Sequence, residues 1–323
     1  MRQDLLNSGE LPAVFTPTLQ QFFQETAALP LWADQRKMRA AMRFFQQYSR
    51  QIMGLLGSYS LPWCYAAADG AKVLYFSERM HANTYQRLQE TGKFLFDVLD
   101  PKAFATNGYG IRSIQKVRLI HEVIRYHLRK SPEWDMAWGL PVNQEDMAGT
   151  NLAFSLVIIR GLRKTGHTIS PEETDAWLHL WKVTGYLLGV DERLLPDNGK
   201  EASLLLQKIE GRHFKPSKEG KLLMTALLKS FEEFAPLNFP KGYLHSYVRY
   251  LVGEKAADLL GLDPSNWTTA IVKQWRNFNL FSSFFSAFSN GEYAGNVKKA
   301  REEALNTPGP IELKLPAGVG RTK

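Results

Sequence analysis

The sequence predicts a mainly α-helical protein. Apolar residues recur at spacings of three and four along most of the 323-residue chain, which is the periodicity of amphipathic helices. Only one stretch has the composition of a strand: KVLYF at 72–76, after the turn signal Asp69-Gly70, and no partner strand is evident. The helices that this periodicity predicts cover roughly residues 17–27, 34–56, 78–97, 112–130, 144–164, 171–189, 199–213, 217–234, 241–251, 254–260 and 266–288.

Three of these helices have recognisable start signals. Each follows a residue whose side chain can accept a hydrogen bond from the first turn of a helix. In two of them an acidic residue or proline in the first turn strengthens the signal. The signals are Ser77 for 78–97, Asn143 with Asp146 for 144–164, and Ser170-Pro171 with Glu172 and Glu173 for 171–189.

The chain is expected to form a single domain. Its length would suit one large domain or two ordinary ones, but we find no internal repeat or linker that divides it. The two ends look peripheral, and the C-terminal one is rich in Pro and Gly. We therefore expect an N-terminal extension at 1–33 that packs on a helical domain at 34–305, followed by a C-terminal tail at 306–323.

Composition excludes several classes of protein. The net charge of +8 permits contact with nucleic acid, but Lys and Arg are spread along the chain and no nucleic-acid-binding motif accompanies them, so we expect no nucleic-acid partner. Cys64 is the only cysteine, which excludes an internal disulfide and cysteine-rich metal sites. The longest apolar run, 151–159, is shorter than the ~20 residues of a transmembrane helix, and the N-terminus has no signal-peptide pattern. We expect a cytoplasmic protein that is a monomer or a homodimer.

A histidine interrupts the apolar stripe of the helix predicted at 112–130. His121 shares one face with Ile114, Val117, Ile124 and Leu128. Arg118 and Arg125 flank it, within about 60° around the helix. The residues alone leave two interpretations open: a buried histidine that bonds to a neighbour, or a ligand of a metal or cofactor.

Common metal and nucleotide sites do not account for His121. His127 lies six residues on, about 240° around the helix, so the two cannot share a zinc ion as the histidines of a zincin do. A single Glu-x-x-His at 210–213 is too little for a di-iron bundle. No phosphate-binding loop or serine-hydrolase elbow is present. We expect His213 and His245 to be structural or surface residues.

A haem would explain more of the pattern. It needs an imidazole that faces an apolar pocket, cations for two propionates and a second helix with polar groups. His121 meets the first need, and Arg118 and Arg125 could meet the second. On the preceding helix Arg87, Glu90 and Thr91 form a polar cluster at i, i+3 and i+4. Spacing alone favours a solvated face for that cluster, with ordinary contacts along the helix.

Five ordered segments of the sequence resemble the MpaB-type oxygenases, also called DUF2236, to which the latex-clearing rubber oxygenases belong. The resemblance covers about residues 55–200 and continues more weakly to about 250. The most specific pieces are VR-x-x-H and YLLGV-x-x-x-LLP. The segments are LLGSYSLPWCYAAADGAKVLYFSERM (55–80), YQRLQETGKF (85–94), VRLIHEVIRYHL (117–128), LPVNQEDMAGTNLAF (140–154) and GYLLGVDERLLP (185–196).

The resemblance implies a globin-like, multi-helix domain that encloses haem b. It implies that His121 is the iron ligand and that Arg118 and Arg125 bind the propionates. Arg87 and Thr91 match the distal arginine and threonine of the family. The activity implied is that of an oxygenase, with O2 and a lipophilic substrate such as an isoprenoid or another unsaturated molecule. The alternative is a non-catalytic haem-binding or redox-sensing protein.

One position departs from the rubber oxygenases. Glu90 stands where those enzymes have a lysine that can coordinate iron. A carboxylate could bind ferric iron through oxygen, or it could act as a base on a substrate C–H. For the additional acidic base of the rubber enzymes, Asp69 and Glu78 are the candidates. A stripe of Trp275, Phe278, Phe281, Phe285 and Phe288 would pack in the core or against a second subunit, or would line a substrate channel.

Overall fold

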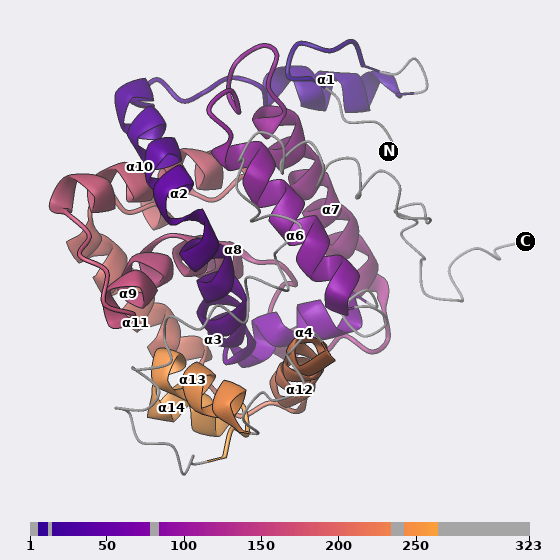
Figure 1. Cartoon of the computed structure of the whole chain (residues 1–323). Coiled ribbons are helices and arrows are strands. Elements are labelled where there is room, and N and C mark those ends of the chain that lie inside the picture. The colour runs from indigo at the N-terminus through magenta and orange to yellow at the C-terminus, as the bar shows by residue number, and fades with distance from the viewer. Residues whose placement is uncertain (1–5, 12–14, 78–83, 234–241, 264–323) are drawn as a thin grey trace, which may run out of the picture.

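The computed structural model describes residues 6–11, 15–77, 84–233 and 242–263 as a bundle of helices (Figure 1). Within these ranges there is no strand, and the one isolated β-bridge joins Ala67 to Phe214. The α-helical class predicted from the sequence is confirmed. The elements are α1 (Pro17–Glu25), α2 (Gln35–Leu55), the π-helix η1 (Leu56–Ser60), α3 (Leu61–Tyr65), α4 (Ala68–Phe76), α6 (Thr84–Leu99), α7 (Gly110–Lys130), the 3-10 turn η2 (Met136–Trp138), α8 (Gln144–Phe154), α9 (Leu156–Lys164), α10 (Pro171–Leu187), the 3-10 turn η3 (Glu192–Leu194), α11 (Gly199–His213), α12 (Lys218–Glu233), α13 (Tyr243–Val252) and α14 (Glu254–Leu259).

The strand predicted at 72–76 is wrong, because these residues form the second half of α4. A short apolar run has no periodicity long enough to separate a buried strand from a helix. Upstream, Asp69 lies in the first turn, where a negative charge stabilises a helix, and pairs with Lys72 at 2.7 Å. Ser77, predicted to begin the next helix, lies at the C-cap of α4.

The helix predicted at 144–164 is divided in two. Ser155 has non-helical backbone angles (φ −106°, ψ −86°), and α9 begins directly after it. The Ser155 hydroxyl donates to the Asn151 carbonyl, and the Trp177 indole donates to the Ser155 carbonyl. The break is therefore held by tertiary contacts that local periodicity does not reveal. The predicted start signals at Asn143 and Ser170 are confirmed, each as a complete capping box.

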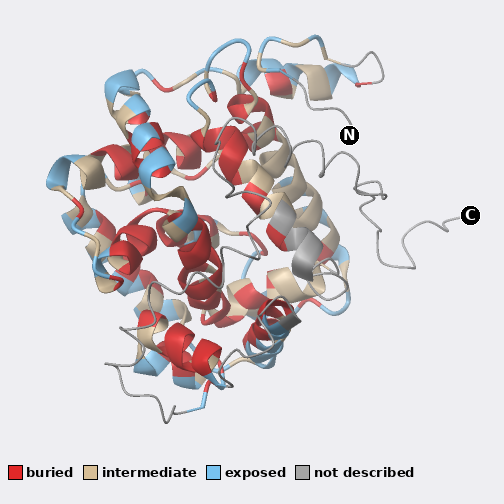
Figure 2. Ribbon diagram, viewed as in Figure 1, coloured by how far each residue is buried: buried red, intermediate tan, exposed pale blue. Residues whose placement is uncertain are grey.

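The core lies where α8, α9 and α10 meet (Figure 2). Most of α9 is buried, and Trp177 and Trp181 of α10 are almost fully buried. α2 packs along α10, α6 packs on α7, and α4 packs on α12. No helix in the described part of the chain is both long and apolar enough to cross a membrane.

The described N-terminal residues contact the start of α7. Asn7 donates to the carbonyls of Ala103 and Ala105, and Gln115 donates to the carbonyl of Phe23, which is fully buried. This is the packing expected of an N-terminal extension. The domain limits at 33/34 and 305/306 stay predictions. The helix predicted at 266–288, its aromatic stripe and the tail lie outside the described residues.

Candidate active site

A small apolar hollow lies against α6, between that helix, η1 and the end of α8. Its volume is about 10 Å³, which is room for about one water molecule. Thr91 provides the only hydroxyl group in its lining. The lining residues are Met53, Leu56, Gly57, Leu61, Leu88, Thr91, Gly92, Leu95 and Phe154. The α6 members recur at helical spacing, so one face of α6 forms a wall of the hollow.

The π-helix η1 helps to shape this hollow. Five residues, Leu56 to Ser60, follow α2 directly and all are buried. Wider helical turns of this kind are rare and occur often at functional sites. Gly57 has no room for a side chain, because a Cβ there would lie 2.7 Å from Cζ of Phe231.

His121 lies in the middle of α7, the helix that packs on α6. Its ring is half-buried, and its Nδ1 atom is buried. On the same stripe Ile114 and Leu128, near the two ends of α7, are buried, whereas Val117 and Ile124 beside the histidine are only half-buried. Figure 2 shows this intermediate burial along the middle of α7.

These residues fit a haem. In the described part of the structure, the apolar stripe around this imidazole is only half-buried, which is an environment that a flat apolar cofactor would complete. An imidazole nitrogen is a common ligand of haem iron. In the described part of the chain no group of three or more His, Cys, Asp or Glu residues could hold a metal ion by itself.

Arg118, three residues before His121, contacts the end of α10. Its Nη1 donates to the carbonyl of Leu187 at 3.4 Å, and its guanidinium lies over the ring of Phe22 at 5.8 Å. Gly189 (φ +87°) lies against it, since a Cβ there would be 3.1 Å from Cζ of Arg118. Helix α10 is thus followed, after its C-cap Leu188, by a left-handed glycine beside this arginine, as is common where helices end.

Arg125, four residues after His121, contacts the turn before α8. Its Nη2 donates to the carbonyl of Val142 at 2.7 Å, and Nη1 pairs with Glu122. Val142 has a positive φ of 53°, which is an outlier for a β-branched residue and costs of order 1–3 kcal/mol. Both arginines therefore have protein partners, and their binding to propionates stays a prediction.

The predicted distal residues lie on α6. Thr91 faces the hollow, and Glu90 is half-buried. Arg87 belongs to the same helix, one turn before Thr91, but its side chain lies outside what the structure describes. Asp69 pairs with Lys72 on α4, and Glu78 is outside the described residues. Thr91 and His121 thus lie on α6 and α7, two helices that pack against each other.

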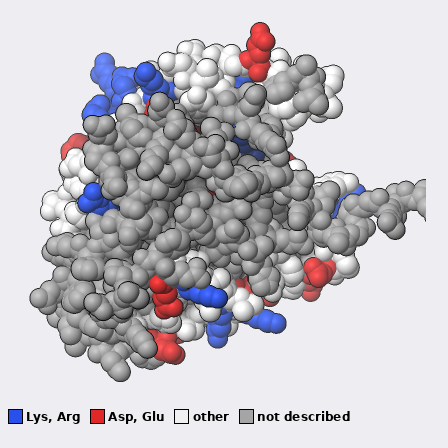
Figure 3. All heavy atoms as spheres, turned by 45° about the vertical axis from the view of Figure 1, so that its right-hand side comes forward, with Lys and Arg blue, Asp and Glu red and all other residues white. Residues whose placement is uncertain are grey.

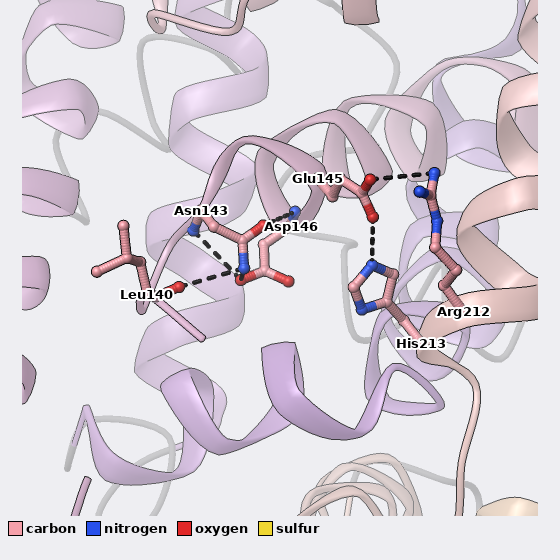
Figure 4. A network of polar contacts seen from close by, with 6 residues as sticks. All are labelled: Leu140, Asn143, Glu145, Asp146, Arg212 and His213. Atoms are coloured by element: carbon pink, nitrogen blue, oxygen red, sulfur yellow. Dashed lines mark hydrogen bonds and ion pairs between the residues drawn. The ribbon is translucent and has the colours of Figure 1, made fainter. Parts of the chain in front are cut away.

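The sequence predicts the helix start at Asn143 and Asp146, but not the polar network of Glu145, Arg212 and His213 beside it (Figure 4). Glu145 accepts a bond from Arg212 at 3.0 Å and contacts Nε2 of His213 at 2.6 Å. Asp146 completes the capping box with Asn143. The Asn-x-x-Asp spacing signals the cap, but no local signal links Glu145 to residues 67 and 68 positions away.

Burial raises the pKa of Asp146 to about 6. The backbone N–H of Asn143 and the charge of His213 oppose this rise, whereas the charges of Asp69 and Glu145 add to it. Burial of the Asp146 carboxyl group in this network therefore affects the free energy of unfolding.

Comparisons with known proteins agree with the fold and the motifs. The family model "ER-bound oxygenase mpaB/B'/Rubber oxygenase, catalytic domain" matches residues 50–283. The rubber oxygenase of Streptomyces sp. (strain K30) is 24% identical over 266 residues, which are 81% of this chain but only 65% of that protein.

Among solved structures, the latex clearing protein LCP in the closed state has the same fold. The TM-score is 0.73 at 20% identity, over 94% of this chain and 83% of that one. Since the family model covers well over half of the sequence, the resemblance seen in the motifs is confirmed. The chain belongs to the MpaB/rubber oxygenase catalytic-domain family.

Proposed function

We propose that this protein is a haem b-dependent oxygenase that adds O2 to a C=C bond of a lipophilic substrate, such as an isoprenoid. The observation that carries the proposal is the pairing of α6 and α7, with Thr91 in the lining of an apolar hollow and His121 in a half-covered apolar stripe. Membership of an oxygenase family supports the class of reaction.

In this proposal His121 holds the iron of the haem. When bound, the haem supplies the iron centre at which O2 is activated. The apolar side chains around Thr91, those of Leu56, Leu61 and Phe154 among them, bind the lipophilic substrate and exclude water. Exclusion of water strengthens the polar contacts that remain.

The polar residues of α6 then have separate roles. The Thr91 hydroxyl orients the oxygen reactant within the hollow, and Arg87 supplies positive charge one helical turn away. Glu90 accepts a proton from a substrate C–H group and later returns it to the product, so that the net reaction remains the addition of O2.

An absorption spectrum tests the cofactor. Wild-type protein expressed with ample haem precursor should show a Soret band near stoichiometric haem, and His121→Ala should lose it. The matched control is His127→Ala, which removes a half-buried histidine of the same helix that packs on Tyr126. The control should keep the band. Folded wild-type protein without a Soret band would contradict the proposal.

Carbon monoxide separates the oxygenase from the alternative. Reduced protein with an open coordination site should shift its Soret band when CO is added. A six-coordinate iron that resists CO would favour a non-catalytic haem-binding or redox-sensing protein instead.

Thr91→Val tests the role of the hydroxyl group. Valine has nearly the same shape, so the hollow and the haem content should be preserved. We expect O2 consumption with an unsaturated isoprenoid to fall about tenfold or more, as when one positioned donor is removed from an active site. An unchanged rate would exclude a catalytic role for this hydroxyl.

A further inference from the structure

We propose that Arg118 and Arg125 are positioning residues that brace α7 against the turns at α8 and α10, and so fix the register of His121. The bracing itself exists without any cofactor. Only its consequence for iron binding rests on the proposed function. It adds a role to the propionate binding that the sequence predicts, because each guanidinium group has five N–H donors and uses only some of them here.

The first brace joins α7 to the end of α10. Arg118 donates to the carbonyl of Leu187, which is one of the last carbonyls of α10 and has no partner within an ideal helix. A cation is also favoured at this end by the helix dipole. A glycine suits position 189, because its φ of +87° is strained for other residues and a Cβ would lie 3.1 Å from Cζ of Arg118.

The second brace joins α7 to the turn before α8. Arg125 donates to the carbonyl of Val142 at 2.7 Å. This carbonyl belongs to the β-branched residue with φ +53°, directly before the N-cap Asn143. A strained turn persists only where its surroundings hold it. The charged hydrogen bond from Arg125 is such a restraint, and the Arg125 side chain is only 21% exposed.

A glutamine ties the two anchor points together. Gln144 donates to the Gly189 carbonyl at 3.0 Å and accepts from the Asp191 backbone N–H at 2.8 Å. The turn after α10 and the turn before α8 are therefore one bonded unit. Arg118 and Arg125 each form a hydrogen bond from α7 to that unit.

The two fastenings bracket the histidine. They lie seven residues apart, about 10 Å along the helix axis, with His121 between them. A slip of α7 by one residue would move the imidazole by about 1.5 Å along the helix and by about 100° around it. Two hydrogen bonds to one unit oppose both motions, so His121 keeps its direction.

Hydrogen exchange of the haem-free protein tests the braces directly. Arg125→Met keeps the apolar stem but removes the donors, and we expect faster amide exchange at residues 139–147. Arg118→Met should do the same at 185–191. Each variant should affect its own turn first, by about tenfold, the expected size for loss of one charged hydrogen bond. The matched control, Arg129→Met, removes an exposed arginine of the same helix and should change neither segment.

Haem retention provides the second readout. In holoprotein both variants should release haem to an excess of haem-free acceptor protein at least fivefold faster than wild type, and Arg129→Met should not. If wild-type protein binds no haem, the proposed function fails, whereas the exchange experiment still decides whether the braces exist.

Other outcomes would overturn the inference. Unchanged exchange in both segments would do so, and so would faster haem loss without faster exchange, which would leave the arginines as propionate ligands only. A uniform rise in exchange along the whole chain would assign them to general stability instead. Should a methionine variant fail to fold, Arg125→Lys and Arg118→Lys serve in its place. Lysine keeps the charge but not the planar fork, so exchange in the same two segments should still rise.

Discussion

The two ends of α8 are built on opposite principles. Its first turn carries Asn143, Glu145 and Asp146 in a network of charges and hydrogen bonds (Figure 4). Its last residue, Phe154, lines the apolar hollow. Eleven residues, about 16 Å of helix, separate a polar junction from a surface suited to a lipophilic molecule. One helix thus joins a structural network to the candidate active site.

The largest expected effect is at the polar end, where Asp146 should make the free energy of unfolding depend on pH. The pKa of Asp146 is raised from 3.8 to about 6 in the folded protein, so the folded state holds the proton more tightly than the unfolded chain does. The free energy of unfolding must then fall as pH rises from about 4 to 6, by at most about 3 kcal/mol from this group. Asp146→Asn should remove this fall.

Urea denaturation of both proteins at several pH values measures the difference. Carboxyl groups that do not interact with Asp146, such as that of Asp191, whose pKa is lowered to about 2 by Arg193, contribute equally to both proteins and cancel. Parallel curves for wild type and Asp146→Asn would contradict the raised pKa.

The apolar end should respond to loss of volume. Phe154 is half-buried, and its ring lies 5.2 Å from that of Trp181. Phe154→Ala should destabilise the protein by about 2 kcal/mol, below the range for a fully buried phenylalanine because the hollow is already incompletely packed. It should also enlarge the hollow and admit a bulkier substrate. Thermal denaturation and the rates of O2 consumption with short and long isoprenoids check both effects, with Phe154→Leu as a control that removes less volume and should show smaller changes.

The comparison also shows what the sequence could predict. Capping at Asn143 and the helix around His121 follow from spacings of three and four residues, so they were predicted correctly. The same periodicity predicted the helix that carries Thr91, whereas the role of Thr91 comes from the family motif and stays a prediction. These signals lie between residues that are close in sequence, or in motifs that follow one another in a fixed order along the chain.

What the sequence could not predict depends on contacts between distant segments. The break at Ser155 is held by Trp177, and the positive φ of Val142 lies beside Arg125. Neither pair has a local pattern that specifies it. KVLYF was predicted to be a strand because five residues, four of them apolar, carry too little periodicity to separate a strand from a helix. In the structure they belong to α4, which packs on α12.

Surface charge tells little about which ion pairs form or what they contribute. Figure 3 shows Lys, Arg, Asp and Glu scattered over the face in view, where the described residues appear. The contact between Glu145 and His213 differs from most such pairs because it lies at the junction of α8 and α11, with side chains only 29% and 20% exposed. Partial burial reduces the screening by water that weakens exposed pairs.

A double-mutant cycle on this contact should give the smallest of the effects. Glu145→Ala, His213→Ala and the double variant should show a coupling energy of about 0.5–1 kcal/mol in urea denaturation at low salt. The matched control is the Lys37–Asp175 pair, at a similar distance of 2.7 Å but with side chains 42% and 43% exposed. Its coupling should be lower and should disappear at high salt, because exposed charges are screened more strongly. Equal coupling energies for the two pairs would mean that partial burial does not strengthen the contact between Glu145 and His213. The network in Figure 4 would then be an ordinary cluster of surface charges.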